Sequence, residues 1–167
     1  MRYVTTVTTR PKRPTEQEGV DYYFVSPERF QEMIRNNELL EWAKVYNNHY
    51  GVPRAPVKQG LEQGHDIIMR IDVQGAATIK KSAPEAVFIF IVPPTMDELQ
   101  VRLQQRHTES ESELTTRLRA AAKEMEQLPM FDYVIVNGQD EIDLAVNDIK
   151  SIITAEKCKV HPREVVL

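Results

Sequence analysis

Three short and almost uninterrupted apolar runs constrain the fold more than any other feature of the sequence. They are Ile67–Val73, Ala86–Val92 and Phe131–Val136. Runs of this length and character are typical of strands that are covered on both faces. Segments with helical spacing separate them, and one begins with Thr95 and Glu98, which form a capping box pattern. The alternation of strands and helices predicts an α/β fold with a parallel sheet and right-handed crossovers.

The N-terminal third of the sequence has a less regular pattern. The threonine-rich segment Tyr3–Thr9 predicts a strand, and Val20–Val25 predicts a second one. Ser26 followed by Pro27 predicts the start of a helix, because serine caps helices and proline fits their first turn. Leu39–Val45 fits a strand or a helix, since periodicity does not decide between them.

Composition narrows the class of protein. The 167 residues fit a single domain, and the single cysteine, Cys158, excludes a fold held together by disulfides. The 21 basic and 25 acidic side chains give a net charge of −4, so we expect no nucleic-acid partner. No apolar run approaches the roughly 20 residues of a membrane-spanning helix. The N-terminus lacks a signal-peptide pattern, so we expect a cytoplasmic protein without membrane association.

Two arginines lie close together on a segment that prolines stiffen. Arg10 and Arg13 are three residues apart, and Tyr22 or Tyr23 could add hydroxyl donors. The planar guanidinium group suits the paired oxygens of a phosphate, so this segment is a candidate anion site. Composition alone favours the plainer alternative, a basic surface loop beside an ordinary strand.

Asp72 stands at the carboxyl end of the first apolar run, where open α/β sheets bind ligands. In nucleotide-handling folds an aspartate at this place often holds Mg²⁺ directly or through water, and Gly75 permits close backbone approach. The alternative is that Asp72 only caps the following helix, and the pattern favours neither reading.

A polar segment, His107–Ser112, lies among four arginines. They are Arg102, Arg106, Arg117 and Arg119. Ser110 and Glu113 form a second capping box pattern, so the arginines flank the junction of two predicted helices. Such a segment could be a flap that brings positive charge over a phosphoryl group, but solvated helix faces also carry arginines.

Taken together, these segments resemble guanylate kinase, which uses ATP to phosphorylate GMP. The matching stretches are, in order, Thr8–Arg13, Gly19–Ser26, Asn37–Ala43, Tyr50–Gly51, Ile71–Gly75, Val92–Pro94, Arg106–Glu109 and Val134–Asn137. Their order and spacing run through essentially the whole chain. The resemblance implies one domain over residues 1–167, with a parallel sheet like that of P-loop NTPases flanked by helices. A GMP-binding region would cover about 5–65, the core about 66–100 and 121–157, and a helical lid about 101–120.

The resemblance also implies roles for individual residues. The GMP site would comprise Thr6, Arg10, Arg13, Tyr22, Glu41 and Tyr50. In it the Glu41 carboxylate would accept from the ring N–H and the exocyclic amine of guanine, a pair that adenine does not offer. The catalytic residues would be Asp72, Arg106 and Arg117, and the ATP side would comprise Asn137, Arg106 and Arg117. The cofactor would be Mg²⁺ with ATP, held by no direct protein ligand but by Asp72 through water. The partners would be GMP and ATP, and the protein would be a monomer or homodimer.

Three departures from the family pattern modify this expectation. Arg70 stands where the family often has an acidic residue, which could weaken base or metal contacts or create another ion pair. Val52 replaces a serine or threonine, which would remove a hydroxyl near the phosphate. The printed sequence also has no first strand with G-x-x-x-x-G-K-[ST], so we expect the chain as written to have impaired kinase activity.

Two alternatives to an enzyme remain open at this point. One is a non-catalytic module that resembles guanylate kinase and binds GMP, a protein or a phosphopeptide. The other is a degenerate remnant without activity. The complete set of residues expected at the GMP site favours an enzyme.

Overall fold

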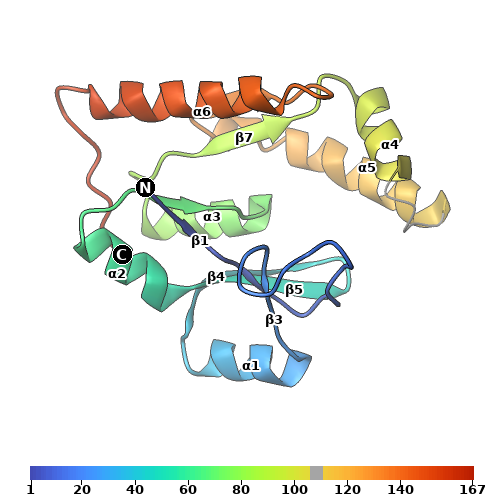
Figure 1. The fold of residues 1–167 in the computed structure, drawn as a ribbon, viewed down its shortest axis with the longest axis horizontal. Helices are drawn as coiled ribbons and strands as arrows, with labels where there is room; N and C mark the ends of the chain where they lie inside the picture. Colours follow the sequence, from blue (N-terminus) through green and yellow to red (C-terminus); the bar gives the residue numbers. More distant parts are fainter. Residues whose placement is uncertain (106–110) are drawn as a thin grey trace. The chain divides into compact units, whose positions relative to one another are not determined.

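The computed structural model describes residues 1–105 and 111–167, which divide into two compact units (Figure 1). The first unit comprises Met1–Glu85 with Val165–Leu167, and the second comprises Ala86–Glu164. Within both units strands alternate with helices, so the α/β class expected from the sequence is confirmed. No helix among the described residues combines the length and apolar character needed to span a membrane.

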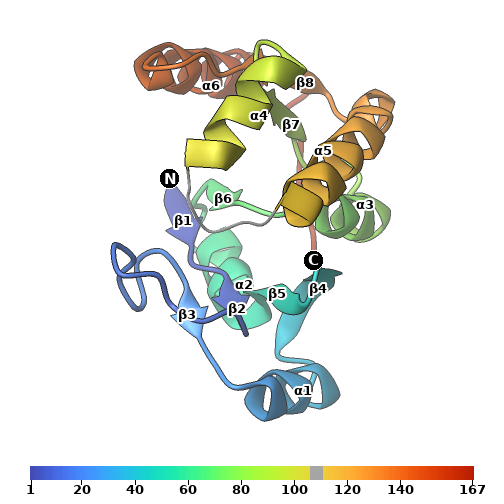
Figure 2. The same cartoon turned by 90° about the vertical axis from the view of Figure 1, so that its right-hand side faces the viewer.

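The first unit contains a parallel strand pair and a four-stranded sheet. The parallel pair is β1 (Arg2–Val4) with β6 (Ile67–Met69), and the larger sheet contains β2 (Val7–Thr8), β3 (Tyr23–Phe24), β4 (Leu39–Val45) and β5 (Asn48–Pro53). The order in the sheet is β3-β2-β5-β4, which Figure 2 shows side by side. Strand β2 is parallel to β3, whereas β5 is antiparallel to both β2 and β4.

The structure decides one open question and corrects one expected strand. Leu39–Val45 is a strand, because it forms an antiparallel hairpin with β5. The single strand expected at Tyr3–Thr9 is two strands in different sheets. Its first part, β1, pairs with β6, and its second part, β2, pairs with β3, with the change of partner near Thr6. The Thr6 hydroxyl donates to the Arg70 carbonyl at 3.3 Å, and the Thr6 carbonyl accepts from Tyr23 N–H at 2.9 Å.

Three helices cover the strands of the first unit. They are α1 (Pro27–Arg35), α2 (Arg54–Glu62) and α3 (Val73–Ser82). The predicted start of α1 is confirmed, because the Ser26 hydroxyl accepts from the Arg29 N–H at 3.2 Å. Phe30 of α1 is fully buried and packs with Val7 and Leu39 in one apolar cluster. This packing attaches α1 to the sheet that carries the candidate site described below.

The second unit is built on the parallel pair of β7 (Ile89–Val92) and β8 (Tyr133–Val136). Its helices are α4 (Met96–Gln105), α5 (Glu111–Met125), the short 3₁₀ helix η1 (Leu128–Met130) and α6 (Ile142–Lys157). The predicted cap of α4 is confirmed, because the Thr95 hydroxyl accepts from the Glu98 N–H at 3.1 Å. The second capping box pattern, which begins at Ser110, lies outside the described residues. All three apolar runs therefore contain parallel strands, although each strand is shorter than its run.

Candidate functional site

The four-stranded sheet of the first unit carries a buried carboxylate on β4. Glu41 is 4% exposed and lies opposite Val52 of β5, next to an irregularity in the strand pairing. Its Oε2 atom has no hydrogen-bond partner within the described part of the chain. A Cβ on Gly75 would lie 2.5 Å from this oxygen, so any side chain at position 75 would collide with the carboxylate. The sheet thus contains a buried hydrogen-bond acceptor, and glycine at position 75 leaves the space that this acceptor occupies.

Burial raises the pKa of Glu41 to about 7, and the negative charge of Asp72 adds to the shift. A hydrogen bond from the Val52 backbone N–H opposes it. At neutral pH the carboxyl group is therefore divided between its ionised and protonated forms. A ligand that donates hydrogen bonds to Glu41 would draw it to the ionised form.

Asp72 caps helix α3, as one of its two sequence interpretations expected. Its Oδ1 accepts from Gln74 N–H at 2.8 Å and from Gly75 N–H at 3.1 Å. The cap brings Asp72 near enough to Glu41 to influence its ionisation. Two acidic side chains from a strand and a helix end therefore share one region, and the cap explains only one oxygen of Asp72.

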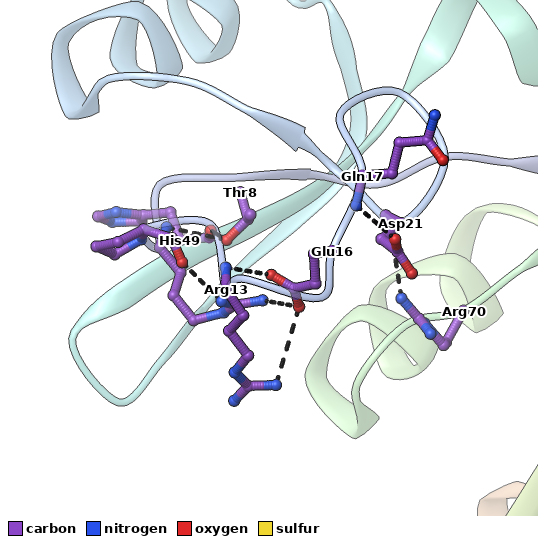
Figure 3. Close-up of polar contacts among 9 residues, drawn as sticks. Thr8, Arg13, Glu16, Gln17, Asp21, His49 and Arg70 are labelled. Carbon is purple, nitrogen blue, oxygen red and sulfur yellow. Dashed lines mark hydrogen bonds and ion pairs between the residues drawn. The ribbon is translucent and has the colours of Figure 1, made fainter. Parts of the chain in front are cut away.

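The two arginines of the proline-stiffened segment face one carboxylate, that of Glu16. Arg10 donates through Nη2 to Glu16 Oε1 at 2.6 Å, and the Arg13 backbone N–H donates to Glu16 Oε2 at 2.8 Å. Arg13 Nη1 lies 3.9 Å from Oε1, as the dashed lines around Glu16 indicate (Figure 3). Burial alone would raise the pKa of Glu16, but the Arg10 and Arg13 hydrogen bonds hold it below its usual value. The segment is ordered around an anion that the chain itself supplies.

Sequence reasoning assigned no role to Glu16, although it lies in the segment that contains both arginines. Its side chain is only 12% exposed, close to the 14% of its partner Arg10. The spacing of three residues between Arg13 and Glu16 was the available signal. The fully buried Thr8 helps to hold the segment, because its hydroxyl donates to the His49 carbonyl and accepts from Arg10 N–H.

Tyr22, Tyr50 and Arg10, which the resemblance places in one site, lie close together beside this segment. The ring centroids of Tyr22 and Tyr50 are 6.0 Å apart with an edge-on arrangement. The guanidinium carbon of Arg10 lies 5.5 Å from the Tyr22 ring centroid. Tyr50 is on β5, where it pairs with Thr8 on one side and Ala43 of β4 on the other. The same sheet therefore holds Tyr50 beside the arginine cluster and Glu41 on the neighbouring strand.

Val52 and Arg70, the two residues that depart from the pattern the resemblance implies, both have structural roles. Val52 is fully buried and packs against Val4 and Val57, so its side chain contributes to the core. Arg70 forms no ion pair within the described ranges; its guanidinium instead lies 5.0 Å from the Tyr22 ring centroid. It also donates through Nη2 to the Asp21 carbonyl at 3.5 Å.

The second unit holds the residues expected at the other nucleotide. Asn137 follows β8, and its buried Oδ1 has no hydrogen-bond partner among residues 1–105 and 111–167. Its carbonyl accepts from Arg102 Nη2 at 2.7 Å. A pocket of about 200 Å³ lies here, lined by Ile91, Val92, Pro93, Leu99, Arg102, Leu103 and Asn137. An apolar pocket with an unpaired acceptor suits a flat ring that carries an N–H donor.

The described geometry does not test the roles predicted for Arg106, Arg117 and a metal ion. Arg117 lies on α5, and Arg106 lies outside the described residues. The described residues contain no group of three or more histidine, cysteine, aspartate or glutamate side chains placed to bind a metal ion. The roles assigned to both arginines and to a metal stay predictions.

Three comparisons with known proteins all find guanylate kinases. The sequence model of guanylate kinase matches residues 1–156. The guanylate kinase of Desulfitobacterium hafniense is 49% identical over 160 residues, which cover 96% of this chain and 79% of the relative. That of Caldanaerobacter subterraneus is 46% identical over 153 residues, covering 92% of this chain and 73% of the relative. The crystal structure of guanylate kinase from Anaplasma phagocytophilum matches with a TM-score of 0.81 and 38% identity, over 95% of this chain and 77% of that one.

Proposed function

Because the chain belongs to the guanylate kinase family, whose members transfer a phosphoryl group from ATP to GMP, we propose that its first unit binds the GMP. The observation that carries this proposal is the unpaired Oε2 of the buried Glu41. A buried acceptor without a donor is costly, so a ligand that supplies donors is favoured. Guanine offers a ring N–H and an exocyclic amine on one edge, which match the two oxygens of a carboxylate.

The phosphate of GMP is assigned to Arg10, Arg13, Tyr22 and Tyr50. Guanidinium groups and tyrosine hydroxyls are suitable donors for phosphate oxygens, and charge-assisted hydrogen bonds are the stronger kind. Glu16 supports this role because it already orients Arg10 and holds the Arg13 backbone. Arginines that are held before the ligand arrives lose less conformational freedom on binding. Thr6 would contribute on the base side of the site.

Phosphoryl transfer needs alignment of the two nucleotides and neutralisation of charge, without a protein nucleophile. We assign charge neutralisation to Arg106 and Arg117, and the adenine of ATP to the pocket beside Asn137. The unpaired Oδ1 of Asn137 supports this assignment, because it can accept from the exocyclic amine of adenine. The reaction would take place in the cytoplasm, and the protein would act as a monomer or homodimer.

Mg²⁺ would accompany ATP, and when bound it would neutralise charge on the phosphate oxygens. The residues present fit an indirect role, because Asp72 uses Oδ1 as the helix cap and leaves Oδ2 for a water molecule. Mg²⁺ commonly keeps several waters and takes few direct protein ligands in nucleotide sites. Asp72 would therefore orient a metal-bound water.

The proposal is tested by a ligand series in calorimetric titrations of the chain. GMP should bind more tightly than IMP, which lacks the exocyclic amine, and IMP more tightly than AMP, which also lacks the ring N–H. Guanosine should bind more weakly than GMP, because it lacks the phosphate. Equal affinities for GMP and AMP would contradict the role of Glu41. Weak binding of GMP together with tight binding of a phosphopeptide would favour a binding module instead of an enzyme.

A further inference from the structure

Arg70 lies between the two halves of the proposed GMP site. It follows β6, and its carbonyl accepts from the Thr6 hydroxyl at 3.3 Å on the base side. Its exposed side chain extends the other way, to the ring of Tyr22 and to the Asp21 carbonyl. Figure 3 shows Arg70 beside Asp21, away from Glu16 and Arg13. One residue thus touches both the base side and the phosphate side.

The ring of Tyr22 is contacted by two guanidinium groups. Arg10 lies 5.5 Å and Arg70 lies 5.0 Å from the ring centroid, both within the range of a cation–π interaction. Tyr50 contacts the same ring edge-on at 6.0 Å. Phe24 contacts the ring as well, with a centroid distance of 5.9 Å. The orientation of Tyr22 therefore depends on these four side chains, and Arg70 is the charged one among them without a place in the proposed phosphate site.

Backbone hydrogen bonds hold the main chain around Tyr22, including one from Tyr23 N–H to the Thr6 carbonyl at 2.9 Å, but they do not set the rotamer of the Tyr22 side chain. Tyr22 precedes β3, a strand of only two residues. It also ends a loop that is closed by hydrogen bonds from Gln17 N–H to the Asp21 carboxylate and from Gly19 N–H to the Tyr22 carbonyl. Arg70 ties this loop to β6 through the Asp21 carbonyl. The Thr5 hydroxyl also ties the loop to the neighbouring strand, through the Gly19 carbonyl at 3.2 Å. Without Arg70 we therefore expect the Tyr22 ring, rather than the loop, to sample more conformations.

We propose that Arg70 is a positioning residue of the phosphate subsite and acts through Tyr22, an inference that rests on the GMP site proposed above. The guanidinium holds the Tyr22 ring, so that the hydroxyl faces the phosphate before GMP arrives. Its exposed position and neutral hydrogen-bond partner leave its charge available to the ring. The substitution of a basic residue at this position thereby strengthens the phosphate side of the site.

The test compares GMP with guanosine in calorimetric titrations of the full chain. R70Q should raise the Kd for GMP about two- to five-fold, the range expected from an exposed cation–π contact, and leave the Kd for guanosine unchanged. R70K keeps a cation over the ring and should restore most of the GMP affinity. R35Q makes the same charge change on the exposed surface of α1 and should leave both affinities at their wild-type values.

A double-mutant cycle tests whether the effect passes through Tyr22. Y22F removes the hydroxyl and keeps the ring, so R70Q should have little further effect on GMP binding in the Y22F background. Additive losses would overturn the inference, because Arg70 would then act independently of Tyr22. Thermal unfolding checks that each variant folds, and R70M replaces R70Q in the comparison if R70Q does not.

The outcomes separate this inference from the proposed function. If the wild-type chain binds GMP no better than AMP or guanosine, the proposed function fails and this inference fails with it. If the wild type discriminates but R70Q binds GMP normally, only the inference is wrong. Equal losses for GMP and guanosine in R70Q would also overturn it, because they would indicate a general effect through Thr6.

Discussion

Two carboxylates in the two units have opposite surroundings. Glu156 of α6 accepts from the Tyr133 hydroxyl at 2.6 Å, from Lys159 Nζ at 2.8 Å and from Arg163 Nε at 2.9 Å. These hydrogen bonds, led by that of Lys159, hold the pKa of Glu156 at about 2. Oε2 of Glu41 on β4 has no hydrogen-bond partner among the residues that the structure describes, and burial raises the pKa of this carboxyl group to about 7.

The difference supports the proposal that Glu41 is the carboxylate that binds a ligand. The partners of Glu156 come from the chain itself, and through Arg163 the cluster also reaches Asp132 at 3.3 Å. Glu156 therefore has a structural role, because it holds Lys159 and Arg163 of the segment after α6 against that helix. Glu41 is left incomplete at a cost in stability, which is typical of groups whose partner is a substrate.

The largest expected effect is on the carboxylate that lacks a partner. E41Q should weaken GMP binding roughly 100-fold, because an amide places an N–H against a donor of guanine and removes the negative charge. Calorimetry with GMP and AMP would measure the loss of discrimination. E62Q, a change at an exposed glutamate of α2, is the matched control. A variant E41Q that still prefers GMP over AMP would contradict the assignment of Glu41 to the base.

The same substitution should act in the opposite direction on the empty chain. Folding raises the pKa of Glu41 from 4.5 to about 7, so its protonated form is favoured in the native state. The associated stability is fully present below pH 4.5 and is lost as the pH rises through 7. At pH 8, E41Q should therefore raise the free energy of unfolding by about 2 kcal/mol. Urea unfolding at pH 8 and pH 4.5 tests this, and the gain should disappear at the lower pH.

The raised pKa also predicts how base recognition depends on pH. The ionised form of Glu41 accepts from guanine, so the affinity should fall up to about ten-fold for each pH unit below 7. Guanosine is the suitable ligand, since the phosphate of GMP titrates near pH 6. Titrations between pH 8 and pH 5 should show the decline in the wild type and a flat profile in E41Q. A flat wild-type profile would contradict the contribution of Glu41 ionisation.

The sequence predicted the strands and caps better than the environment of these carboxylates. The apolar runs and Ser26 have local signals, and their elements were confirmed. Leu39–Val45 stayed undecided because its identity depends on pairing with β5. The burial of Glu41 had no local signal, and the role of Glu16 had only its spacing of three residues from Arg13. Both depend on residues that only the fold brings near, Gly75 for Glu41 and the conformation of Arg10 for Glu16.

The contact between Arg70 and the Tyr22 ring also could not be predicted from the local sequence, because it depends on residues that the fold brings together. Its sequence position suggested weaker base or metal contacts or another ion pair, because an acidic residue is usual there. The structure gives it the Tyr22 ring instead. An ion pair depends on a carboxylate within reach, and among the described residues the polar partner of the Arg70 guanidinium is the Asp21 carbonyl, while the Asp21 carboxylate accepts from Gln17 N–H.

The smallest expected effect is on the carboxylate that the chain has already satisfied. E156Q keeps acceptor capacity but loses the charge, so it should lower the free energy of unfolding by about 1 kcal/mol at pH 7. Folding lowers the pKa of Glu156 from 4.5 to about 2, so its stabilisation is present above pH 4.5 and is lost as the pH falls through 2. Urea unfolding of the wild type and E156Q should therefore differ at pH 7 and converge toward pH 2. GMP affinity at pH 7 should be the same in both, whereas a joint loss of stability and GMP binding would contradict the separation of a structural carboxylate from a ligand-binding one.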